Sequence, residues 1–121
     1  MKFATLLFFL LLTVAGVSSE VWGHSFPDHS EPRVGNEVNG SPAEVRIFFD
    51  VAVEPLFSTI EVFDSNHRKV DKNDSHVDPN DHTILAVSLL PLLSPGPYEV
   101  HWSVISIDTH HTEGTYKFKI R

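Results

Sequence analysis

Residues 97–120 read PYEVHWSVISIDTHHTEGTYKFKI, and this stretch decides the fold. Its first half alternates apolar and polar side chains, and so does its end, as half-buried strands do. The apolar positions are Tyr98, Val100, Trp102 and Val104, then Tyr116, Phe118 and Ile120. Between them, SIDTHHTEG (residues 106–114) interrupts the pattern with two acids and two adjacent histidines. We therefore predict two strands joined by a polar connection.

The rest of the chain repeats this combination of short alternating segments and turn residues. Strands are predicted in AEVRIFF (43–49), STIEVFD (58–64) and HTILAVSL (82–89). Segments rich in Gly, Pro, Asn and Asp separate them, at residues 31–42, 64–69, 71–81 and 93–97. No segment has a sustained helical period, and there is no internal repeat or linker. The pattern predicts one all-β domain, an antiparallel β-sandwich or barrel.

Residues 1–23, MKFATLLFFLLLTVAGVSSEVWG, have the layout of a cleaved secretory signal peptide, with a basic Lys2, an apolar run and small residues. The apolar run is shorter than the ~20 residues of a membrane-spanning helix, so a soluble exported domain is expected. Small residues allow cleavage after Ser19 or after Gly23. The second cut leaves a mature domain of residues 24–121 that begins with His24.

Charge and cysteine content exclude several partners. The formal net charge is −7, and the chain has no cysteine. Nucleic acids and anionic membranes require clustered Lys and Arg, so neither is expected as a partner. Acidity suits cations, although many secreted proteins are acidic for solubility alone. Without disulfides, stability must come from packing or from a bound ligand.

Histidine is the residue type that carries candidate chemistry. There are eight histidines, and the single methionine is residue 1, so the mature chain offers imidazole and carboxylate donors. Such donors suit Cu(II), Ni(II) or Zn(II), whereas Cu(I) prefers sulfur. Most scattered surface histidines are only polar residues, and five are interpreted in this way: His29, His67, His76, His82 and His101.

Asp108 and His110 form an Asp-x-His pair directly after a predicted strand. Residues i and i+2 of an extended backbone project to the same side, so this pair can converge on one ion while His111 points away. Alone the motif is weak, and more often marks a turn with a satisfied aspartate. If the mature chain starts at His24, its α-amine and ring nitrogen complete an N3O set that favours tetragonal Cu(II). The amine must lose a proton to bind, so affinity should depend on pH.

Four segments resemble the CopC family of periplasmic copper-binding proteins. They are HSFPDHSEP (24–32), VRIFF (45–49), PLFSTIEVFD (55–64) and LSPGPYEVHWSVISIDTHHTEGTYKFKI (93–120). The resemblance implies a small Greek-key β-sandwich, immunoglobulin-like and similar to a cupredoxin barrel. It also implies one Cu(II) per chain, bound by the mature amino-terminal histidine and the Asp-x-His pair, here His24, Asp108 and His110. Cleavage after Gly23 and a periplasmic location follow from the same resemblance.

Two departures from the family pattern limit the implied chemistry. Some relatives have a methionine-rich loop for Cu(I), but this chain has no methionine after residue 1, so no thioether site is expected. Many relatives have a glutamate near the copper, within an SE dipeptide. The matching position here is Val51, preceded by Asp50. Whether Asp50 substitutes for that glutamate stays open, and it is not assigned as a ligand.

The favoured function is non-enzymatic. We expect a monomer that buffers, sequesters or delivers Cu(II) outside the cytoplasm, with no catalytic residue and no other cofactor. The resemblance implies copper resistance or supply to an inner-membrane importer of the CopD type. Weak binding of a second ion by His76 and His82 leaves copper-linked dimers open. An additional donor to the main site is also open, from His29, His111 or Glu113.

Two other functions remain as alternatives. One is an immunoglobulin-like structural module in which the histidines are incidental. The other is a copper monooxygenase with a histidine brace. The second is disfavoured because Trp102 and Tyr116 lie on predicted core faces and leave no aromatic platform for a sugar.

Overall fold

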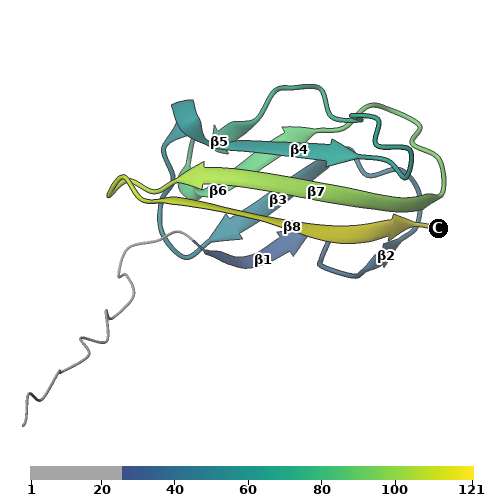
Figure 1. The fold of residues 1–121 in the computed structure, drawn as a ribbon, viewed down its shortest axis with the longest axis horizontal. Coiled ribbons are helices and arrows are strands. Elements are labelled where there is room, and N and C mark those ends of the chain that lie inside the picture. Colours follow the sequence, from purple (N-terminus) through teal and green to yellow (C-terminus); the bar gives the residue numbers. More distant parts are fainter. Residues whose placement is uncertain (1–25) are drawn as a thin grey trace, which may run out of the picture.

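Two four-stranded sheets pack face to face in the computed structural model, which describes residues 26–121 (Figure 1). The first sheet has the order β1-β3-β6-β5, formed by Pro27–Glu31, Glu44–Phe49, Asp81–Ser88 and His76–Asp78. The second has the order β2-β8-β7-β4, formed by Glu37–Val38, His111–Ile120, Gly96–Ile105 and Thr59–Phe63. A short 3-10 turn, η1 (Pro55–Phe57), precedes β4. The predicted all-β sandwich is confirmed.

The β7–β8 hairpin is the longest ladder of the described chain. It is antiparallel and runs from the pair Gly96 and Ile120 to the pair Ile105 and His111. Residues 106–110 connect the two strands at one end of the sandwich (Figure 1). Both predicted strands are therefore present, and the polar connection lies between them.

The inner face of this hairpin lies in the core. Val100 and Val104 are fully buried, and Trp102 is only 9% exposed, as the alternation predicts. Gly114 is paired with Trp102 across the ladder. A Cβ at Gly114 would lie 2.6 Å from Cζ2 of the Trp102 indole, so the absence of a side chain there lets the ring pack against the β8 backbone.

Strand β6 departs from the predicted alternation. Four consecutive residues, Ile84–Val87, are buried. The strand lies between β3 and β5, and its outward residues pair with Phe48 and Arg46 of β3. The Phe48 ring is itself stacked against His29 of β1 at 4.1 Å between centroids. Side chains of β3 therefore lie beside the outer face of β6, while its inner residues Leu85 and Val87 pack in the core.

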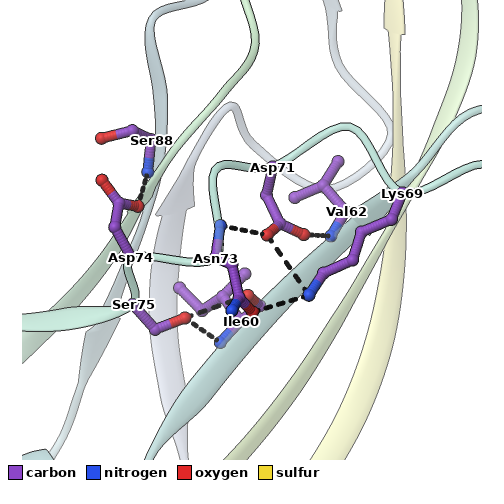
Figure 2. Close-up of polar contacts among 8 residues, drawn as sticks. All are labelled: Ile60, Val62, Lys69, Asp71, Asn73, Asp74, Ser75 and Ser88. Atoms are coloured by element: carbon purple, nitrogen blue, oxygen red, sulfur yellow. Dashed lines mark hydrogen bonds and ion pairs between the residues drawn. The ribbon is translucent and has the colours of Figure 1, made fainter.

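The connection between β4 and β5, residues 64–75, covers the outer edge of β4 (Figure 2). The carboxylate of Asp71, fully buried, accepts hydrogen bonds from the backbone N–H groups of Val62 and Asn73, both at 2.8 Å. The Ser75 hydroxyl bonds both backbone groups of Ile60, accepting at 2.9 Å and donating at 3.0 Å. Side chains thus satisfy the backbone groups that an edge strand would otherwise expose.

The same connection reaches the other sheet. The carboxylate of Asp74 accepts a hydrogen bond of 2.7 Å from the backbone N–H of Ser88, at the end of β6. Hydrogen bonding from Ser88, first from its side chain and then from this backbone N–H, lowers the pKa of Asp74. Residues 64–75 therefore join the two sheets along this side of the sandwich.

Candidate metal centre

The loop between β7 and β8 is a compact turn closed by its own backbone. Ser106 N–H donates to the His110 carbonyl at 2.9 Å, and Thr109 N–H donates to the Ser106 carbonyl at 2.8 Å. Thr109 has φ of 75°, in the left-handed region that a non-glycine residue adopts mainly in turns. The hydroxyl of the buried Ser106 donates to Oδ1 of Asp108. The carboxylate is therefore oriented from inside the sandwich.

Asp108 and His110 meet directly. Nδ1 of His110 lies 3.0 Å from Oδ2 of Asp108. The side chains are 38% and 49% exposed, so solvent ions can reach both. The hydrogen bond from Ser106 and then that from His110 lower the pKa of Asp108. The carboxylate is consequently ionised at neutral pH and available as a metal ligand.

The convergence of this pair agrees with the sequence analysis, but the predicted cause is wrong. Asp108 and His110 do not lie on an extended strand, because β7 ends at Ile105 and β8 begins at His111. The side chains meet across the turn that left-handed Thr109 makes. The sequence analysis noted that this motif more often marks a turn in which the aspartate is fully hydrogen-bonded. Asp108 fits that description too, because Ser106 and His110 both contact its carboxylate.

The additional donors that the sequence left open have other contacts. His111 begins β8, and its Nε2 lies 2.8 Å from the Ser103 hydroxyl and 3.9 Å from a Glu113 oxygen. His29 lies on β1, where its ring stacks on Phe48. Its Nδ1 is 3.3 Å from a carboxylate oxygen of Asp28. These contacts link each histidine to its own or its neighbouring strand.

Other histidines have local partners. His101 is 3.0 Å from a Glu99 oxygen on the outward face of β7, and its ring meets Phe63 edge-on at 5.0 Å between centroids. Nδ1 of His76 is 2.9 Å from the Asp74 carbonyl. In residues 26–121, no three histidine, aspartate or glutamate side chains are grouped to hold a metal ion. Asp108 and His110 are thus a pair that needs further donors.

The segment 50–53 links the first described residue to this loop. Phe26 N–H donates to Oδ1 of Asp50 at 2.8 Å, and Asp50 N–H donates to the Phe26 carbonyl at 3.0 Å. Farther along, Ile107 N–H donates to the Ala52 carbonyl at 3.2 Å, and residues 53 and 106 form an isolated β-bridge. The start of β1 and the β7–β8 loop lie toward the same end of the sandwich (Figure 1).

His24, the third predicted ligand, lies outside the described residues, as do the predicted signal peptide and its cleavage sites. Sequence reasoning also missed one residue of the site, Ser106. A serine two positions before an aspartate in a polar connection is a signal for a local hydrogen bond, and it could have been used. Among residues 26–121, no helix has the length and apolar character needed to cross a membrane.

Comparison with known proteins gives a consistent result. The family model described as the CopC domain matches residues 28–121. Protein YobA of Escherichia coli (strain K12) is 30% identical over 111 residues, which cover 92% of this chain and 90% of YobA. Copper transport protein CutJ of Bacillus subtilis (strain 168) is 31% identical over 111 residues, covering 92% of this chain but 20% of CutJ.

Solved structures share the fold. CopC from Methylosinus trichosporium OB3b has a TM-score of 0.74 at 32% identity, over 80% of this chain and 93% of that one. PcoC, a methionine rich copper resistance protein from Escherichia coli, has a TM-score of 0.68 over 81% of this chain and 99% of that one. At 24% identity, PcoC supports the fold alone. The family match and the relatives at 30% identity or more show that the chain belongs to the CopC family of copper-binding proteins.

Proposed function

We propose that this chain is an exported protein that binds one Cu(II) ion through His24, Asp108 and His110. The observation that carries the proposal is the Asp108–His110 pair, held at 3.0 Å in the β7–β8 loop. The loop lies toward the same end of the sandwich as the start of β1 (Figure 1). His24 precedes Phe26 by two residues, a span of at most about 7 Å, so a donor from His24 is within reach of this end.

The donor set suits Cu(II). An α-amine and ring nitrogen from His24, an imidazole from His110 and a carboxylate from Asp108 make an N3O site of the kind that Cu(II) favours. The mature chain has no methionine or cysteine for Cu(I). We infer that the protein holds copper in its oxidised state and lacks a second, sulfur-based site.

The role that fits such a site is to buffer, sequester or deliver copper. The family is one of periplasmic copper-binding proteins, and these are generally not enzymes. We propose that residues 1–23 direct export, that the mature protein begins at His24, and that it works as a monomer in the periplasm. We also propose a delivery partner of the CopD importer type. This agrees with the match to CutJ, a copper transport protein, although the alignment covers only 20% of its length.

Electron paramagnetic resonance of the mature protein with one equivalent of Cu(II) tests this function. Mass spectrometry first establishes that the chain begins with His24. We expect one tetragonal, nitrogen-rich signal, because three nitrogens surround the ion. One residue added before His24 should abolish this signal, and His110→Ala should alter it. His76→Ala, a histidine on β5 with a backbone partner, is the matched control and should change nothing.

A heterogeneous signal that neither change affects would contradict the proposal. The histidines would then bind copper only as surface groups, and the site would be no more than a turn with a satisfied aspartate.

A further inference from the structure

Asp50 holds the first described residue through two hydrogen bonds. Its Oδ1 accepts the Phe26 N–H at 2.8 Å, and its own N–H donates to the Phe26 carbonyl at 3.0 Å. The next residue, Pro27, pairs with Phe49 in the β1–β3 ladder. The Asp50 side chain therefore extends this ladder by one rung, with a carboxylate in place of a backbone acceptor.

The two bonds to Asp50 hold the backbone of a residue whose side chain is exposed. Phe26 is 52% exposed, so burial of its side chain contributes little. A hydrogen bond to a carboxylate is about twice as strong as one between neutral groups. Asp50 thus contributes directly to holding the Phe26 backbone.

Asp50 also begins the segment that contacts the β7–β8 loop. Two residues later, the Ala52 carbonyl accepts the Ile107 N–H at 3.2 Å. Residue Val53 then pairs with Ser106, whose hydroxyl orients Asp108. One short segment therefore contacts both the amino-terminal end of β1 and the loop that carries the Asp108–His110 pair.

We propose that Asp50 is a positioning residue for the amino terminus, an inference that rests on the proposed copper function. By fixing Phe26, it keeps the amine and ring of His24 within reach of Asp108 and His110. The role proposed for Asp50 is that of a hydrogen-bond acceptor, since its Oδ1 accepts the Phe26 amide. Ordering a chain end lowers its conformational entropy. Because Asp50 already holds Phe26 in the copper-free protein, less entropy is lost when the metal binds.

The test compares three variants of the full mature protein. Asp50→Ala removes the acceptor, and Asp50→Asn keeps an Oδ1 acceptor but removes the charge. Asp28→Ala removes a neighbouring charge that contacts His29 and whose side chain is 74% exposed. Cu(II) affinity is measured by competition with a chelator, and the coordination by electron paramagnetic resonance. Exchange of the Phe26 amide hydrogen is followed by NMR in the copper-free protein.

We expect Asp50→Ala to weaken Cu(II) binding about 10- to 100-fold, the usual effect of losing a group that orients a ligand. Its signal should show fewer coordinated nitrogens, and its Phe26 amide should exchange faster. Asp28→Ala should resemble the wild-type protein. Asp50→Asn keeps an acceptor but makes the weaker bond between neutral groups, so it should fall between the wild-type protein and Asp50→Ala. Thermal melts confirm folding, and Asp50→Glu, which shifts the carboxylate by one methylene, replaces Asp50→Ala if the latter unfolds.

Two results overturn the inference. Wild-type affinity and signal in Asp50→Ala would mean that the hydrogen bond does not position the site. An Asp50→Asn variant as weak as Asp50→Ala would mean that charge, not positioning, is what Asp50 supplies. Failure of the wild-type protein to bind Cu(II) would instead contradict the proposed function itself, while amide exchange would still report whether Asp50 holds Phe26.

Discussion

At the scale of single residues, Tyr116 is the side chain whose burial has a measurable cost. It is 8% exposed and lies on the inner face of β8. Burial raises the pKa of Tyr116 to about 12, and the nearby Ser30 offsets part of that rise. The Ser30 hydroxyl donates to the Pro32 carbonyl at 2.9 Å, and the Tyr116 hydroxyl has no hydrogen-bond partner among the described residues.

This predicts a loss of stability at alkaline pH. The phenol of an unfolded chain has a pKa of about 10, so the folded state holds the proton more tightly. The contribution is fully present below pH 10 and declines as pH rises towards 12. We expect the wild-type protein to lose about 2 kcal/mol more than Tyr116→Phe between pH 9 and 11.5, as measured by urea unfolding. Parallel pH profiles for the two proteins would rule this out.

At the scale of elements, the connection over residues 64–75 stabilises an exposed edge. In Asp71→Ala, the backbone N–H groups of Val62 and Asn73 would lose their acceptor beside a buried site. An unsatisfied buried group costs about 1–3 kcal/mol, so we expect a decrease of that size in the free energy of unfolding. Hydrogen exchange at the Val62 amide should accelerate in parallel.

The matched control for this prediction is Asp71→Asn. It retains an acceptor oxygen and loses the ion pair with Lys69, whose Nζ is 3.7 Å away. We expect it to be less damaging than Asp71→Ala. If both variants lose the same unfolding free energy, the effect comes from the charge of Asp71 and not from its hydrogen bonds at the edge of β4.

The strands that could be predicted from the sequence are those long enough to show a recognisable pattern of apolar residues. Strands β3, β4, β6, β7 and β8 have five to ten residues each, and all five were predicted, although the burial of β6 does not alternate. Strands β2 and β5 have two and three residues and lie within predicted turn segments. Strand β1, PDHSE, is mostly polar and joins its sheet through backbone pairing with β3. Short or polar edge strands depend on tertiary pairing, which a local pattern does not report.

The candidate site follows the same rule. The sequence indicated the Asp108–His110 pair, because its two donors are only two positions apart in the chain. The roles of Asp50 and Ser106 depend on contacts of other kinds. Asp50 contacts a residue 24 positions earlier, and Ser106 acts through the turn that left-handed Thr109 creates. The spacing of Ser106 and Asp108 was a usable local signal, whereas the left-handed turn and the long-range contact of Asp50 are set by the folded chain and have no direct signal in the sequence.

At the scale of the whole molecule, a ligand that binds only the folded state must raise its stability. At a free Cu(II) concentration 100 times the dissociation constant, the gain is about 2.7 kcal/mol. For a domain of this size, that predicts an increase in melting temperature of about 10–20 °C. Calorimetry with and without a chelator measures it. His110→Ala should show a much smaller increase, and an equal increase in that variant would place the copper elsewhere.

The two ends of the β7–β8 hairpin have different consequences for attachment. Ten residues per strand, at about 3.3 Å each, separate the loop of the proposed metal site from the pair Gly96 and Ile120 by roughly 30 Å. Arg121, beside that pair, lies at the far end from the loop (Figure 1). A solid support, dye or fused domain joined at Arg121 would leave the metal end facing outward. The same handle placed before His24 would block the amine of the proposed site, so that site predicts that only attachment at Arg121 preserves copper binding.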